Sequence, residues 1–217
     1  YIQRMRALFI LGVLPCLIAA SQLNSSQPPA TVDVAAIQRF IPKNFSVLSL
    51  AQGELNADGK TDYALAVERT ASSSKPAQRR LLIIVSDPKA EDGLKIAQQY
   101  WRFIPLPTAE GEDPFAYLAI NEGSIDVQFK PPNAGRSSTT YIFKPDGKRF
   151  VLSSLQRYQV KPATGMFNET VINLEQGERA STSGSMSSPR HLKKIEKFKP
   201  SKVWTPCRID DPLNFEP

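Results

Sequence analysis

Cysteine and histidine are scarce in this chain of 217 residues, which contains two cysteines and one histidine. No spacing of Cys and His that is typical of a zinc site occurs. A Ser-His-Asp or Cys-His catalytic arrangement would have to use His191, which lies in the basic stretch 190–194 and is typical of a solvated surface group. No G-x-S-x-G motif is present, and the S-x-x-K match at 72–75 lacks the S-D-N and K-T-G partners of penicillin-recognising enzymes. The sequence therefore gives little support to a nucleophilic hydrolase.

An apolar run of transmembrane length is also missing, because the uncharged stretch 7–20 has about fourteen residues and a bilayer needs about 20. Arg4 and Arg6 precede this stretch, and small residues end it, as in a secretory signal. We therefore predict a signal peptide at 1–20, a periplasmic or secreted protein, and no transmembrane segment after signal cleavage. Cys16 leaves a lipoprotein anchor open, but no small residue precedes it, which favours ordinary cleavage.

Cleavage would remove two arginines and no acids, so 27 basic residues become 25 against 21 acidic ones, and the net charge falls from +6 to +4. Cys207 would then be the last cysteine, and no internal disulfide could form. Residues 21–31 are rich in Ser, Gln and Pro, which predicts a disordered linker. The remaining residues, 32–217, are ample for a single domain that is held together by a hydrophobic core.

After the linker, the sequence consists mainly of short strand-like segments separated by turn residues. Val34, Ile37, Phe40 and Ile41 have helical spacing, and we predict one helix over 33–41 that Pro42 ends. Strands are expected at 45–50, 63–68, 80–86, 94–100, 115–120, 125–129, 140–143, 149–160, 170–174 and 179–182. The sequence thus predicts an all-β or β-dominated domain of antiparallel sheets, arranged as a sandwich or a partial propeller, with one short N-terminal helix.

The connection between the first two expected strands contains oxygen-bearing side chains at nearly every second residue. In the stretch GELNADGKTDYALAV, Glu54, Asn56, Asp58 and Asp62 take positions one, three, five and nine of a calcium loop, and the carbonyl of Lys60 takes position seven. An EF-hand is excluded, because position twelve is Leu65 and a strand follows the loop. The loop nevertheless supplies the hard oxygen ligands that Ca²⁺ prefers.

This stretch resembles the FG-GAP or VCBS-type calcium loop, D-x-N-x-D-G-x-x-D followed by an apolar strand, with Glu54 in place of the usual Asp. The resemblance implies a bound, structural Ca²⁺ and a β-rich fold. A complete propeller is not expected, because the motif occurs once and a propeller needs at least four blades. More widely, the chain is similar to small exported bacterial proteins of unknown role that have a single loop of this kind. The segments 113–115 and 171–174 belong to that wider match.

Simpler alternatives remain open for the candidate sites. The loop at 54–62 could be a plain turn in which Asp62 caps the start of a strand. The acids Glu110, Glu112 and Asp113 could serve a hydrolase, or lie in an exposed loop. The basic tail 190–202 could bind anionic envelope groups or an acidic protein, and is also typical of a lysine-rich edge strand.

We therefore predict an exported binding or structural module with a calcium loop, rather than an enzyme. Its expected partners are an envelope component or another exported protein, and nucleic acid is not expected. The alternatives are a periplasmic hydrolase that uses loop carboxylates, and an inhibitor or immunity-type protein.

Overall fold

The described part of the chain begins at residue 34. The computed structural model describes residues 34–132, 137–147, 149–188 and 190–199, together with 204–206, 209, 212–213 and 215. They all belong to one unit, Asp33–Pro217. The predicted signal peptide (1–20), the predicted linker (21–31) and Cys207 lie outside the described residues.

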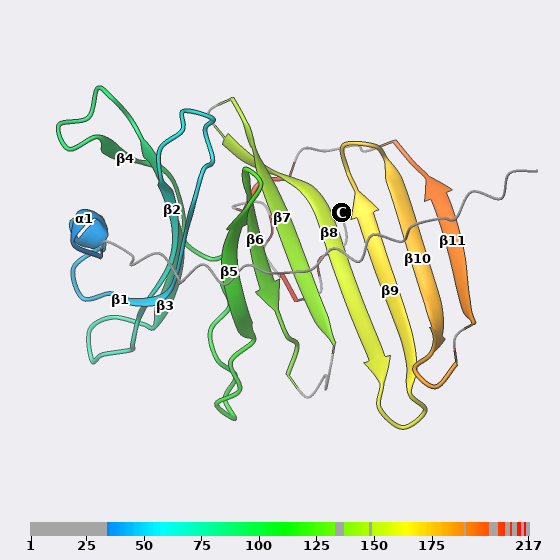
Figure 1. Ribbon diagram of the computed structural model, residues 1–217. Coiled ribbons are helices and arrows are strands. Elements are labelled where there is room, and N and C mark those ends of the chain that lie inside the picture. The colour runs from blue at the N-terminus through cyan, green and yellow to red at the C-terminus, as the bar shows by residue number, and fades with distance from the viewer. Residues whose placement is uncertain are drawn as a thin grey trace, which may run out of the picture. The chain divides into compact units, whose positions relative to one another are not determined.

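Strands dominate the described residues, and a single short helix precedes them (Figure 1). The helix is α1, Val34–Gln38. The strands are β1 Ser46–Gly53, β2 Asp62–Arg69, β3 Gln78–Ser86, β4 Leu94–Tyr100, β5 Phe115–Asn121, β6 Ser124–Phe129, β7 Ser138–Asp146, β8 Arg149–Lys161, β9 Met166–Asn173, β10 Glu178–Ser185 and β11 His191–Lys197.

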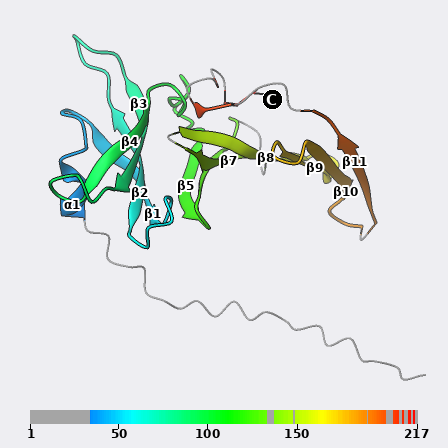
Figure 2. The same ribbon diagram turned by 90° about the horizontal axis from the view of Figure 1, so that it is seen from above.

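The strands form two antiparallel sheets in which neighbours in sequence are neighbours in space. The four-stranded sheet has the order β1-β2-β3-β4, and the seven-stranded sheet has the order β11-β10-β9-β8-β7-β6-β5 (Figure 2). Antiparallel strands that are neighbours in sequence need only short hairpin loops, so turn residues recur at regular intervals along the chain. The predicted fold class, β-dominated with antiparallel sheets and one short helix near the N-terminus, is confirmed.

Three local predictions need correction. The helix ends at Gln38 rather than near Pro42, because Phe40 and Ile41 donate to carbonyls three residues back and so form tight turns. The strand expected at 140–143 is longer, Ser138–Asp146, and so includes Pro145 and Asp146. The strand expected at 170–174 begins four residues earlier, at Met166, and pairs with β10 along its whole length.

The four-stranded sheet is buried on both faces along β2, where Asp62 to Val67 are all buried. Alternate residues point to opposite faces, so Tyr63, Leu65 and Val67 pack with Ile37 of α1 in one apolar cluster. The small side chains Ala64 and Ala66 face the other way, into a second cluster shared with the seven-stranded sheet. This position between two layers explains why β2 reads as a continuous apolar run rather than an alternating one.

The contact between the sheets is close where β1 meets β5. A Cβ atom added to Gly53 would lie only 2.5 Å from Cγ2 of Ile120, so only glycine fits there without a shift of its neighbour. Further along, Phe103 from the segment that joins the sheets inserts its ring among the aromatic residues of the seven-stranded sheet. The segment that contains Phe103 and the two sheets thus share one hydrophobic core.

The end of the seven-stranded sheet that is formed by β11 is much more exposed to solvent. All seven residues of β11 are exposed, including Leu192 and Ile195, and β11 forms the sheet edge. Its lysines are of the kind that discourages pairing with another sheet. The edge-strand interpretation of residues 191–197 in the basic tail is therefore confirmed.

Candidate calcium-binding loop

The candidate loop, residues 54–62, connects β1 to β2 and contains two left-handed backbone positions. Gly59 has a φ of 76° and Ala57 has a φ of 58°. Glycine adopts this conformation without a steric cost, and a calcium loop uses glycine at the sixth position for its sharp bend. Gly59 occupies that position, so the backbone turns where the sequence pattern requires it.

Asp62 anchors the loop to the sheet and is fully buried. Its Oδ2 accepts the backbone N–H of Leu55 at 2.6 Å, and its Oδ1 accepts the backbone N–H of Ser86 at 2.7 Å. The carboxylate therefore ties the start of β2 to the loop and to the end of β3. Leu55 is itself buried in the shared core, which holds the loop from inside.

Asn56 and Asp58 extend the same anchorage to Ser86. The amide nitrogen of Asn56 donates to the carbonyl of Ser86 at 3.2 Å and to its Oγ at 3.0 Å. The hydroxyl of Ser86 donates to Oδ2 of Asp58, and the backbone N–H of Lys60 donates to Oδ1 of Asp58 at 2.9 Å. Three of the predicted ligand residues thus converge on the end of β3.

Glu54 completes the internal bonding of the loop. Its Oε1 accepts the backbone N–H of Asn56 at 3.1 Å and that of Asp58 at 3.2 Å. A carboxylate has about four lone-pair positions on its two oxygens. Each of the three carboxylates therefore retains acceptor capacity beyond the hydrogen bonds that hold the loop.

The charges of the loop carboxylates also influence one another's pKa values. Burial raises the pKa of Asp62, its two backbone N–H donors oppose the rise, and the charges of Glu54 and Asp58 add to it. The pKa of Asp58 is lowered, chiefly by the hydroxyl of Ser86, with help from Lys60. Three carboxylates around one short loop leave an excess of negative charge that one lysine does not balance.

The residues present suit Ca²⁺ in chemical type. Carboxylate oxygens from Glu54, Asp58 and Asp62, the amide oxygen of Asn56 and the carbonyl of Lys60 make an all-oxygen donor set, as a hard cation requires. In the part of the chain that the structure describes, no three His, Cys, Asp or Glu side chains are already gathered at metal-binding distances. Binding would therefore require the carboxylates to turn inward from their present hydrogen bonds.

A cavity of about 440 Å³ lies beside the loop. Asn56 and Ser86 line it together with Lys95 of β4 and Gly147. Sequence reasoning missed Ser86, because it lies 24 residues beyond Asp62 and no motif includes it. The apolar Leu55 within an acidic stretch was the sequence signal that the loop is anchored to a core, and its side chain is buried in the structure.

The other candidate carboxylate, Asp113, belongs to an ion-pair cluster around Arg79. Arg79 is almost fully buried, and its side chain makes hydrogen bonds to Asp113, to Glu68 and to the carbonyl of Pro105. The contact with Asp113 is bidentate, at 2.7 and 2.6 Å. Paired in this way, Asp113 fixes the segment between the sheets and is not poised as a general acid.

We expect the Asp113→Asn variant to lose about 1–2 kcal/mol of stability at neutral pH, because a partly exposed charge-assisted contact is broken. The hydrogen bonds from Arg79 lower the pKa of Asp113. Its stabilising contribution is therefore complete above the unfolded pKa of about 3.9 and is lost as the pH falls through the lower folded value.

Urea unfolding of both proteins between about pH 3 and pH 7 measures this difference. The wild type and the variant should converge at the acid end. Asp146→Asn, which removes an exposed carboxylate paired with Arg149, serves as the control and should change stability little. A gap between wild type and Asp113→Asn that stays constant to the lowest pH would contradict the assignment.

The remaining catalytic candidates do not assemble into a site. The ring of His191 packs edge-on against Phe167 with centroids 4.9 Å apart, and no hydrogen bond or ion pair of its side chain occurs among the described residues. Ser72 and Lys75 bond to each other through their backbones across an exposed tight turn. This turn lies in the loop that joins β2 to β3.

Comparison with known proteins leaves the chemistry of the loop as the main guide to function. No family model matches this sequence, and no curated protein matches it either. Among the residues that the structure describes, no helix has the length and apolar character needed to cross a membrane.

Proposed function

We propose that this chain is an exported, periplasmic binding or structural module in which the loop 54–62 binds a structural Ca²⁺. The observation that carries the proposal is the convergence of Asp62, Asp58 and Asn56 on the end of β3. A cation among these oxygens links three strands of one sheet. Its role is to stiffen the β1–β2 connection, and it performs no chemistry.

Two further observations support calcium over a plain turn. The left-handed Gly59 occupies the bend position of a calcium loop. The charges of Glu54 and Asp58 also raise the pKa of the buried Asp62, which is a cost that a divalent cation offsets. Export itself rests on the sequence pattern of residues 1–20.

The hydrolase alternative has weaker support. A glycosidase-type mechanism needs one carboxyl group with a raised pKa as general acid. In the segment between the sheets, the pKa of Asp113 is lowered chiefly by Arg79, and that of Glu110 is lowered chiefly by its own backbone N–H. Both carboxyl groups are therefore held ionised. The inhibitor or immunity alternative stays a prediction from the sequence.

Thermal unfolding with and without calcium tests the proposal. A site with a dissociation constant of about 10⁻⁴ M is expected to raise the melting temperature by about 3 °C at millimolar Ca²⁺. Mg²⁺ should raise it less, because Mg²⁺ demands stricter octahedral geometry.

Matched variants make the test specific. Asp58→Ala should abolish the calcium-dependent shift, whereas Asp146→Ala, which removes an exposed carboxylate at the end of β7 in the other sheet, should retain it. The proposal fails if millimolar Ca²⁺ leaves the wild type unchanged, or if both variants respond as the wild type does.

A further inference from the structure

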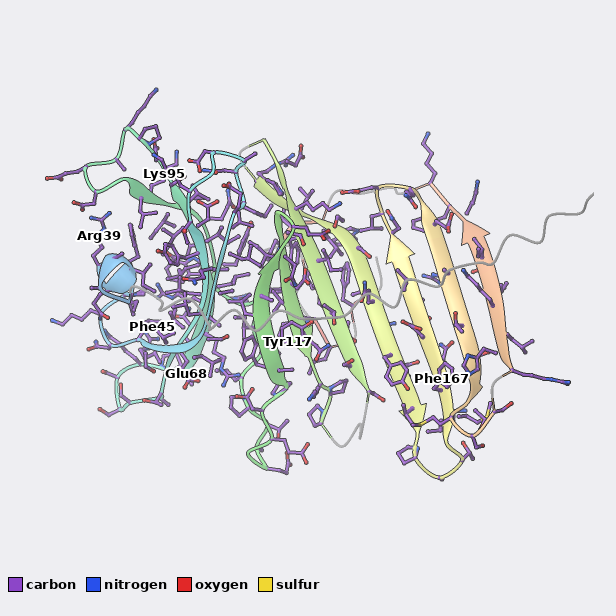
Figure 3. The ribbon with its side chains drawn as sticks, viewed as in Figure 1. Arg39, Phe45, Glu68, Lys95, Tyr117 and Phe167 are labelled. Carbon is purple, nitrogen blue, oxygen red and sulfur yellow. The ribbon has the colours of Figure 1, made fainter. Side chains whose placement is uncertain are left out.

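Two arginines lie together at the end of the four-stranded sheet opposite the calcium loop. Arg69 ends β2 and pairs with Gln78, and Arg80 of β3 pairs with Val67, so the two side chains are diagonal neighbours on one face. This is the face that packs against α1, and Phe45 lies on the same side (Figure 3). The guanidinium of Arg80 is 4.3 Å from the ring centroid of Phe45 and 3.9 Å from that of Trp101.

Within the part of the chain that the structure describes, these two arginines have no counter-charge in an ion pair. Arg69 donates to the carbonyl of Pro76 at 3.0 Å, and Arg80 donates to the side-chain oxygen of Gln78 at 3.1 Å, so both known acceptors are neutral. No ion pair to either arginine occurs among the described residues. The neighbouring Arg79 points to the other face and takes both nearby carboxylates, Glu68 and Asp113.

The same two side chains contain the unsatisfied polar atoms of the described structure. Nε of Arg69 and Nε of Arg80 are the two buried side-chain nitrogen or oxygen atoms without a hydrogen-bond partner in that part of the chain. Buried donors without an acceptor are rare in folded proteins, and each calls for a physical cause. Both donors belong to guanidinium groups whose charge no carboxylate of the described residues balances through an ion pair.

A cavity of about 310 Å³ opens beside these groups, at the lower end of the volumes typical of small-molecule sites. Three arginines line it: Arg69, Arg102 and Arg79, of which Arg79 is already paired with carboxylates. Trp101 and Leu106 supply an aromatic and an apolar wall. Trp101 is 53% exposed, so part of its ring is open to a ligand beside the guanidinium of Arg80. The cavity thus combines charge for an anion with a flat surface for a ring.

We propose that this cavity binds the phosphate group of a small phosphomonoester whose ring or apolar part lies against Trp101 and Leu106. Guanidinium groups match phosphate oxygens through paired N–H donors. Arg69 and Arg102 line the cavity, and Arg80 lies diagonally beside Arg69. Their positive charge exceeds what one carboxylate balances, and a phosphate dianion balances it better. The site is separate from the calcium loop, because the two lie at opposite ends of β2.

Tryptophan fluorescence during titration with phenyl phosphate tests the proposal directly. The chain has two tryptophans, and Trp204 packs against Phe215 away from this cavity. We expect a saturable change in the wild type that Trp101→Phe removes, together with a rise in melting temperature that this variant retains. Inorganic phosphate should bind more weakly, because it lacks the ring.

Charge variants distinguish a specific binding site from non-specific electrostatic attraction. Arg69→Gln and Arg102→Gln are each expected to weaken binding of phenyl phosphate at least about tenfold. Arg149→Gln, which removes an equal charge from an exposed turn of the other sheet, should leave binding unchanged. Arg102 is exposed, so its variant stays informative if Arg69→Gln proves unstable.

Any one of four results would overturn the proposal. One is the absence of a saturable response up to about 10 mM phenyl phosphate. Another is equal loss of binding in Arg149→Gln and Arg69→Gln, which would indicate non-specific charge attraction. The third is binding of benzoate as tight as that of phenyl phosphate, which would assign the cavity to carboxylates. The fourth is binding only to phosphatidic acid vesicles, which would assign the cavity to a lipid headgroup.

Discussion

Replacement of Asp62 by alanine is expected to destabilise the fold by about 3–5 kcal/mol. The carboxylate is fully buried and accepts the backbone N–H groups of Leu55 and Ser86. Without it, two buried donors lose their acceptor, and each loss costs about 1–3 kcal/mol. The cavity left at the start of β2 adds to this cost. Chemical denaturation at pH 7 measures the effect.

Two variants show whether those hydrogen bonds are the cause. Asp62→Asn keeps one acceptor oxygen but turns an NH₂ group towards a backbone donor, so an intermediate loss is expected. Asp58→Ala removes an exposed carboxylate from the same loop, and should cost much less in the absence of calcium. Equal losses in Asp62→Ala and Asp58→Ala would show that Asp62 is not the anchor of the loop.

Truncation of Phe103 to alanine is expected to cost about 3–5 kcal/mol, the usual range for a buried phenylalanine. Phe103 is 1% exposed and belongs to the segment that joins the two sheets. Its ring meets Phe129, Tyr141 and Phe143 edge-on, with centroids 5.4, 5.5 and 5.2 Å away. Edge-to-face pairs of this kind add stability beyond the apolar area that they bury.

The control for Phe103 comes from the same segment. Leu106 is 43% exposed, so Leu106→Ala should change the free energy of unfolding by less than about 1 kcal/mol. Both variants are compared by urea unfolding monitored by circular dichroism. If Phe103→Ala were as mild as Leu106→Ala, the segment would not be part of the shared core.

Much of the fold could be predicted from local sequence signals. Most strands were located to within a few residues, because hairpin turns rich in Gly and Asn separate short apolar runs. The clearest case is the β5–β6 turn, where Glu122 and Gly123 both have positive φ, at 46° and 76°. Two such residues form the tight turn that suits a hairpin.

Other features depend on contacts between distant residues and have no local signal. Nothing in the sequence divides the strands into sheets of four and seven, because the division depends on the segment around Phe103. The ion pair of Arg79 with Asp113 spans 34 residues, and the link between Asp62 and Ser86 spans 24. Pattern reasoning identified Asp62 and Asp113, but it could not find their partners.

Direct measurement of Ca²⁺ binding by isothermal titration calorimetry tests the central claim most directly. The full chain, stripped of metal by a chelator, should bind one Ca²⁺ with a dissociation constant of about 10⁻⁴–10⁻³ M, and Asp58→Ala should not bind it. Asp146→Ala should bind as the wild type does. A wild-type protein that releases no heat with Ca²⁺ at concentrations of several millimolar would contradict the claim, and the loop 54–62 would then be a turn held by its hydrogen bonds and by the buried Leu55.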